Sequence, residues 1–248
     1  MGWFSKKKVD EVDPTDVDAV ETSYEEPEDL IYEHHHNAMQ RYWESIGSVD
    51  SDVLTYVINP MFQGAPPWPN TRQAYRLVRT DDTLIIASDG LADPFPDDPT
   101  LETRFGFGME TFIEVRGMQD ATTDEVRIHW AFNAIQAMAM NTAAARGFVP
   151  QLVQHGAVSI ELPTDSGPAG WVKPNGVLGA LVDVQMPSRQ NIVEDTPIGP
   201  VRIVPITALY PAEIDLCASG GQARLALAAD LASRASGHIT DPERPPLR

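Results

Sequence analysis

Two short apolar runs joined by a polar turn limit most strongly what this chain can fold into. Residues Ala74–Arg79 and 83–88 are rich in Leu, Ile, Val and Tyr, and Thr80-Asp81-Asp82 separates them. Runs of this length on either side of a three-residue turn predict an antiparallel β-hairpin. Further strands are expected at 53–58, 104–115, 157–162, 176–184 and 201–206. The chain therefore predicts a largely antiparallel sheet.

Four segments carry the signals of helices. The longest covers 123–146, where Ile128, Phe132 and Ile135 recur at helical spacing, Thr122 or Thr123 suits the N-cap and Gly147 the C-cap. Other helices are expected from residue 27 to a stop at 47, from 211 onward, and over 222–236. We expect an α+β fold, with a mostly antiparallel or mixed sheet packed against two or three helices.

The chain is strongly acidic, with a formal net charge of -18. Phosphate binding needs a basic surface, so this charge argues against a nucleic-acid partner, and it also disfavours attraction to anionic lipid. It suits a basic protein partner. Acidity often serves only to keep a protein soluble, however, and both interpretations stay open.

Acidic residues are concentrated near the N-terminus. Every charged side chain from Val9 to Glu33 is acidic, which accounts for 11 of the 36 acidic residues. Because like charges repel, we expect a flexible acidic arm at 1–27, one α+β domain at 28–238, and a frayed, proline-rich end at 239–248. The Trp3-Phe4 pair, followed by three lysines, could dock on a membrane or on the arm's own acidic stretch; a disordered terminus is the alternative.

Cysteine content and hydropathy indicate a cytoplasmic protein. Cys217 is the single cysteine, so no internal disulfide can form. No run of 18 or more apolar residues is present to span a membrane, and the N-terminus lacks the apolar stretch of a secretory signal. These features fit a reducing compartment.

Metal binding and nucleophilic catalysis have little support in the sequence. His34, His35 and His36 are consecutive, so on a helix they point about 100° apart and cannot converge on one ion. Cys217 could act as a nucleophile if a histidine approached it, but free cysteine is among the most buried residue types. We expect no bound metal and no cofactor.

Two further stretches resemble ligand-binding loops without matching them. Gly106-Phe107-Gly108 lacks the third glycine and the following helix of a dinucleotide fingerprint. The aspartates at 89, 93, 97 and 98 lack the order of a calcium loop, so a solvated loop is the default interpretation. A hydrolase that uses Asp89, His129 or Cys217 remains the enzymatic alternative.

Aromatic and acidic residues in two loops and one strand are the candidate contacts for a protein partner. Proline-rich loops are expected at 59–70 and 93–99, and the strand at 104–115 carries aromatic residues on one face. Large aromatic side chains are effective anchors in interfaces. An ordinary core position is the alternative for the aromatic residues. The candidate partner-binding residues are Trp68, Asp89, Leu91, Phe95, Phe105, Phe107 and Glu110.

Four segments, taken in order, resemble the suppressor-of-fused-like domain over about residues 50–235. They read LIIASDGL at 84–91, GFGMETF at 106–112, GVLGA at 176–180 and PITALYPAEI at 205–214. That family shows a strand ending in a Ser-x-Gly-Leu turn, an aromatic Gly-x-Glu strand and a Pro-Leu-Tyr-x-x-Glu segment, which here reads Ala-Leu-Tyr-Pro-Ala-Glu. The length resembles the bacterial single-domain type, and the acidic arm is not part of the family pattern.

The resemblance implies a protein that binds another protein and has no known catalytic centre. The animal member clasps a transcription-factor peptide by strand addition, and bacterial members are often predicted to be immunity proteins that neutralise toxins. We therefore expect a non-catalytic protein-binding module that neutralises or sequesters its partner, such as a basic toxin or peptide. The alternatives are a hydrolase-like enzyme with an unrecognised site and a structural scaffold subunit with an acidic docking arm.

Overall fold

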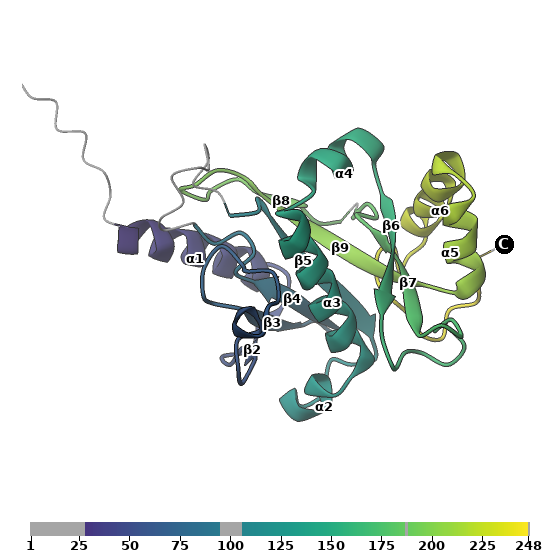
Figure 1. Ribbon diagram of the computed structural model, residues 1–248, viewed down its shortest axis with the longest axis horizontal. Coiled ribbons are helices and arrows are strands. Elements are labelled where there is room, and N and C mark those ends of the chain that lie inside the picture. Colours follow the sequence, from purple (N-terminus) through teal and green to yellow (C-terminus); the bar gives the residue numbers. More distant parts are fainter. Residues whose placement is uncertain (1–27, 95–105, 187, 248) are drawn as a thin grey trace, which may run out of the picture.

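The structure is built around one mixed β-sheet (Figure 1). It is a computed structural model that describes residues 28–94, 106–186 and 188–247. Seven strands follow the order β1-β3-β4-β5-β9-β7-β6, while β2 also pairs with β3 and β8 with β9. The β5–β9 pair is parallel and the other strand pairs are antiparallel. The strands are β1 (Ser48–Val49), β2 (Leu54–Thr55), β3 (Ala74–Arg79), β4 (Thr83–Asp89), β5 (Met109–Arg116), β6 (Val158–Pro163), β7 (Val177–Val182), β8 (Ile192–Val193) and β9 (Val201–Leu209).

The expected hairpin is formed by β3 and β4. Val78 pairs with Ile85 across the two strands, and the Thr80 N–H donates to the Thr83 carbonyl (3.0 Å) to close the turn. Successive side chains of β4 lie on opposite faces of the sheet. Ile85 packs with Val78 in an apolar cluster on one face, and Ile86 belongs to a second apolar cluster on the other face. A strand buried on both faces needs a cover on each side.

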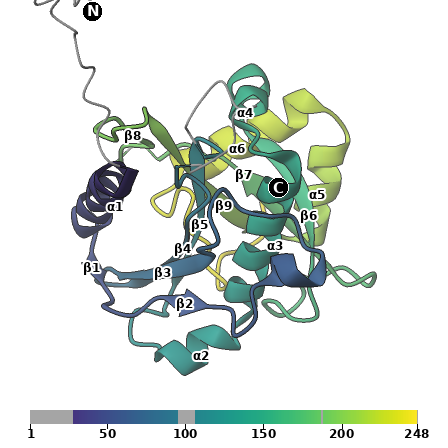
Figure 2. The same ribbon diagram turned by 60° about the vertical axis from the view of Figure 1, so that its left-hand side comes forward.

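Helices supply that cover and complete an α+β fold, as the sequence predicts (Figure 2). Helix α1 (Glu28–Glu44) lies on one face, where Trp43 meets Phe112 edge to face at 5.7 Å between ring centroids. Helix α3 (Trp130–Ala145) covers the opposite face and buries Phe132 against Tyr75. Helices α5 (Pro211–Ala218) and α6 (Gly221–Ser233) pack together near β7.

The prediction of one long helix at 123–146 is wrong, because the chain breaks at Ile128 and His129. The first part is α2 (Thr123–Arg127), which Thr122 caps as one of the two expected N-cap residues. His129 adopts an extended backbone, and its Nδ1 accepts a hydrogen bond from the Ala131 N–H (3.2 Å), so that it caps α3. Ile128 leaves the buried face as a result and is 81% exposed.

Several boundaries also differ from the sequence-based expectation. The strand expected at 104–115 begins only at Met109, since Gly108 has a φ of +66° that departs from an extended strand. The strand expected at 53–58 shortens to the two residues of β2. Helix α4 (Val149–His155) and the 3₁₀ helix η1 (Pro60–Gln63) were not expected.

The C-terminal segment was expected to fray over 239–248, yet its described residues 239–247 pack against the sheet. Thr240 is fully buried, and its N–H donates to the Glu114 carbonyl (2.8 Å). Arg244 forms a buried ion pair with Glu213. The expected acidic arm at 1–27 lies outside the described residues. In the part of the chain that is described, no helix is long and apolar enough to cross a membrane.

Candidate functional site

The end of β4 is joined to the start of β5 through one buried carboxyl group. Glu110 accepts hydrogen bonds from the Gly90 N–H (3.0 Å), the Ala92 N–H (2.9 Å) and the Ser88 hydroxyl. Gly90 has a φ of +137°, and a Cβ there would lie 2.7 Å from the Arg72 carbonyl oxygen, so the turn requires glycine. The turn and the strand that the sequence singled out separately thus form one hydrogen-bonded unit.

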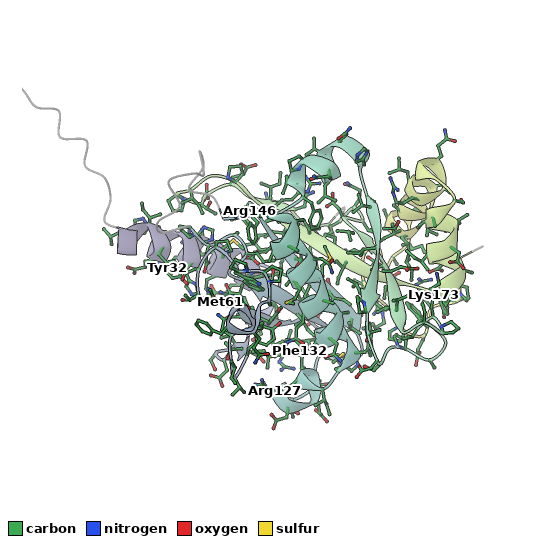
Figure 3. All side chains as sticks on the ribbon, in the orientation of Figure 1. Tyr32, Met61, Arg127, Phe132, Arg146 and Lys173 are labelled. Carbon is green, nitrogen blue, oxygen red and sulfur yellow. The ribbon has the colours of Figure 1, made fainter. Side chains whose placement is uncertain are left out.

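An ionic cluster lies beside this turn, beneath α1. Arg72 and Arg76 both donate to the Asp89 carboxylate, with 2.9 Å between Arg76 Nη2 and Asp89 Oδ2. Tyr32, which Figure 3 labels on α1, donates its hydroxyl to Asp93 Oδ2 (3.3 Å). Burial raises the pKa of Asp93 to about 6, although Arg72 opposes the shift. The cluster ties α1 to the turn that follows β4.

The three consecutive histidines of α1 occupy different environments. His34 is exposed, His36 is half-buried, and His35 is buried beneath the helix. Burial lowers the pKa of His35 to about 4, so its imidazole is neutral near pH 7. Within the described residues, no group of three or more His, Cys, Asp or Glu side chains is arranged to hold a metal ion.

An apolar pocket of about 370 Å³ opens between the proline-rich loop, the residues before β5 and the C-terminal end of α3. Gly147 allows the close approach of these parts, because a Cβ at this position would lie 2.7 Å from the Phe107 carbonyl oxygen. Figure 3 labels Arg146 at the same end of α3. The residues that line the pocket are Pro66, Pro67, Trp68, Phe107, Ala143, Ala144 and Arg146. A pocket with aromatic walls suits an apolar side chain of a ligand.

Two of the candidate partner-binding residues, Trp68 and Phe107, line this pocket together. Both are largely buried, being 4% and 8% exposed, so they offer a partner only a small part of their surface. The other described candidates, Asp89, Leu91 and Glu110, are buried in the turn after β4 and at the start of β5. Their contact with a partner stays a prediction. The remaining two candidates, Phe95 and Phe105, lie outside the described residues.

The residues of the enzymatic alternative do not come together. Asp89 is held by two arginines at the end of β4, and His129 caps the start of α3. Cys217 is buried in α5, where burial raises the pKa of its thiol to about 11. A nucleophile and its base must lie within hydrogen-bond reach, which these three residues do not.

Other residues of the site were not singled out from the sequence. Arg72 and Arg76 are four residues apart, and the period of two in an extended chain indicates that they share one face. Two cations on one face of a strand, opposite a strand that ends in Asp89, are a signal that sequence reasoning could have used. The alanines at the end of α3 carry no such signal, because their role depends on where the proline-rich loop lies.

No family model and no curated protein matches this sequence. Among solved structures, a chain of the Sufu-Fu complex crystal structure aligns with a TM-score of 0.53 and 13% identity, over 86% of this chain and 90% of that chain. Drosophila Suppressor of Fused aligns with a TM-score of 0.56 and 14% identity, over 86% of this chain. The match covers 50% of the Drosophila chain.

The fold of this chain is therefore that of suppressor of fused, which confirms the resemblance of the four ordered segments at the level of the fold. Three of those segments form β4 with its turn, β5 and β7, and the fourth runs from β9 into α5. The resemblance thus follows the elements that build the centre of the sheet.

Proposed function

We propose that this chain is a non-catalytic protein-binding module whose partner inserts an apolar side chain into the pocket beside Trp68 and Phe107. The pocket is the observation that carries the proposal, because three segments distant in sequence form one apolar cavity there. The fold supports it, since one of the similar chains was solved in a complex of Sufu with Fu. Apolar pockets with aromatic walls are common anchor sites in interfaces.

The chemistry of the chain favours a basic partner and a sequestering role. The net charge of -18 attracts a basic toxin or peptide and accelerates their association. The four ordered sequence segments resemble a family whose bacterial members are often predicted to be immunity proteins, and this favours neutralisation of such a partner in the cytoplasm. In this proposal Trp68 and Phe107 contact the partner, while Asp89, Leu91 and Glu110 keep the turn after β4 in place.

Filling the pocket tests the proposal without removing a core residue. Ala144 lines the pocket and is exposed, so Ala144→Gln should block the cavity while the fold is kept. Ala145→Gln is the matched control, because Ala145 is the neighbouring exposed alanine of α3 and does not line the pocket. Trp68→Ala is less suitable, since truncating a buried tryptophan costs about 3–5 kcal/mol of stability.

The measurement is the affinity for the protein that co-purifies with the tagged chain from its own cells, determined by calorimetry with purified components. Ala144→Gln should weaken binding by about tenfold or more, and Ala145→Gln should leave it within about twofold. Equal affinities of the two variants, with both folded by circular dichroism, would show that the partner does not use the pocket.

A further inference from the structure

A second surface of the chain exposes apolar side chains in an unusual concentration. Among the residues that the structure describes, nine large apolar side chains are exposed, and five of them belong to segment 53–62 or to the adjoining α2–α3 junction. Val57 is fully exposed and Phe62 is 76% exposed. The apolar patch consists of Val53, Val57, Ile58, Phe62 and Ile128. Clustered exposed apolar residues mark interaction sites far more often than single ones do.

Hydrogen bonds hold segment 53–62 of the apolar patch in a defined conformation. Asn59 caps η1 by accepting from the Met61 N–H (3.0 Å) and donates to the Thr71 carbonyl (2.7 Å). Tyr56, one residue before Val57, is bonded to the buried Tyr75 hydroxyl at 3.0 Å. The folded backbone therefore fixes which side chains are exposed. Leu54 and Tyr56 face the protein, and Val53 and Val57 face the solvent.

Segment 53–62 contacts the end of α2 through β2. Arg127, the residue before Ile128, lies 3.4 Å from the Thr55 carbonyl oxygen through its Nη1 atom. Figure 3 shows Met61 and Arg127 on the same side of the molecule, beside α3. This contact places the junction of α2 and α3, with Ile128, beside β2 and the residues that flank it.

Exposed carboxylates border the apolar patch. Asp52 precedes Val53, and Asp124 stands one helical turn before Ile128. Glu125 is exposed beside Asp124 and accepts hydrogen bonds from Thr122. Arg127 is an exposed cation beside them, so these three carboxylates outnumber it and the border of the patch is acidic on balance. An apolar centre with such a border is complementary to apolar side chains flanked by cations.

We propose that the apolar patch binds a partner segment in which apolar side chains are flanked by lysines or arginines. This inference rests on the proposed protein-binding function, but it concerns a different surface. Ile128 lies next to the N-terminal end of α3 and the pocket at its C-terminal end, and a helix of 16 residues separates its ends by about 24 Å. Phe62 is the member of the patch nearest in sequence to the pocket, four residues before Pro66, but it does not line the pocket. Phe62 and Ile128 supply the apolar contact, and Asp52 and Asp124 attract the cations.

The test uses the full chain and two defined peptides. One labelled 14-residue peptide carries leucines at helical i, i+3, i+4, i+7 spacing with lysines elsewhere, and the other carries glutamates in place of the lysines. Fluorescence anisotropy measures the affinity of each peptide for the wild type and for variants. Phe62→Ser and Ile128→Ser should each weaken binding of the Leu/Lys peptide by about fivefold or more.

Matched controls test whether binding depends on the patch itself, and not on any exposed apolar side chain or any exposed carboxylate. Val153→Ser removes another exposed apolar side chain, on α4, and should leave the affinity within about twofold. Asp124→Asn should weaken binding and reduce its salt dependence, whereas Asp165→Asn, on an exposed loop, should not. The Leu/Glu peptide should bind at least about tenfold more weakly than the Leu/Lys peptide.

Several outcomes would overturn the proposal. The proposal is wrong if the Leu/Lys peptide does not bind the wild type or if the two peptides bind with equal affinity. It is also wrong if Val153→Ser weakens binding as much as Phe62→Ser does. If Ala144→Gln alone weakened the Leu/Lys peptide, the pocket would be the binding site and the patch would not. If sedimentation velocity showed a wild-type dimer that Phe62→Ser converts to a monomer, the occupant would be a second copy of the chain. If Ala144→Gln left the affinity for the co-purifying partner unchanged, only the proposed role of the pocket would be wrong, and the proposal for the patch would stand.

Discussion

Glu110 is a carboxyl group that lies inside the protein, and none of the described residues forms an ion pair with it. Three hydrogen-bond donors, the Ser88 hydroxyl and two backbone N–H groups, stabilise its charged form. Burial opposes them and is the larger effect, so the pKa of Glu110 is raised to about 7. The group therefore titrates near neutral pH, at the point where β4 and β5 are joined.

Glu110→Gln should change the pH dependence of stability. Because the folded-state pKa is above the ordinary value of 4.5, the folded protein binds the proton more tightly. The resulting stabilisation is complete below pH 4.5 and is lost as the pH rises through 7. From pH 5 to pH 8 the wild type should lose about 2–3 kcal/mol relative to Glu110→Gln, measured by urea unfolding. Parallel pH profiles of the two proteins would contradict the raised pKa.

At the scale of elements, α5 packs on β7 where the strand has no side chain. A Cβ at Gly179 would lie 2.6 Å from the Cβ of Ile214, which is closer than real atoms approach. Glycine therefore sets the distance between the helix and the sheet. Ile214 fills the space and is 4% exposed.

Gly179→Ala should force α5 away from β7 and destabilise the protein. Overpacking of this kind costs about 1–3 kcal/mol. Gly221→Ala is the control, since a Cβ there would meet only the Arg224 guanidinium at 3.7 Å at the start of α6. Thermal unfolding followed by circular dichroism should show a lower Tm for Gly179→Ala only. An unchanged Tm would mean that the helix shifts without loss of packing.

At the scale of the whole molecule, the C-terminal segment connects distant parts of the sheet. Thr240 donates its N–H to β5 and accepts the Ala208 N–H of β9 at 3.0 Å. Arg244 pairs with Glu213 of α5 through two nitrogens, at 2.7 and 2.6 Å. Its guanidinium also lies 4.7 Å from the ring centroid of Trp171. The last described residues thus belong to the folded core.

Arg244→Ala should destabilise the whole domain, because it leaves the buried Glu213 carboxylate without its cation. Loss of one partner of a buried pair costs about 3–5 kcal/mol. Lys173→Ala is the control, since Lys173 pairs with Glu161 and Asp215 at the surface and its loss should change stability little. Chemical denaturation of both variants measures the difference. A small effect of Arg244→Ala would show that the C-terminal segment is not part of the cooperative unit.

Local sequence signals predicted the parts of the fold in which neighbours in sequence are neighbours in space. The hairpin of β3 and β4 follows from its turn and its apolar runs, and the start of α5 follows from Pro211. The break at Ile128 and His129 escaped the pattern, because both residues fit a helix by spacing alone. The packed C-terminal segment escaped it too, since its contacts join residues about 30 positions apart, such as Glu213 and Arg244.

For the candidate site too, the sequence predicted one part and only the structure showed the other. The residue types that line it, Trp68 and Phe107 among them, were evident from the sequence as aromatic residues in loops and beside strands. The sequence by itself thus determined the fold class, the hairpin and the chemical character of the surface residues. Only the tertiary structure decided that Trp68 and Phe107 share one pocket and that the junction of α2 and α3, with Ile128, lies beside segment 53–62. Such groupings depend on which loop lies across α3, and periodicity and turn chemistry act over too few residues to specify it.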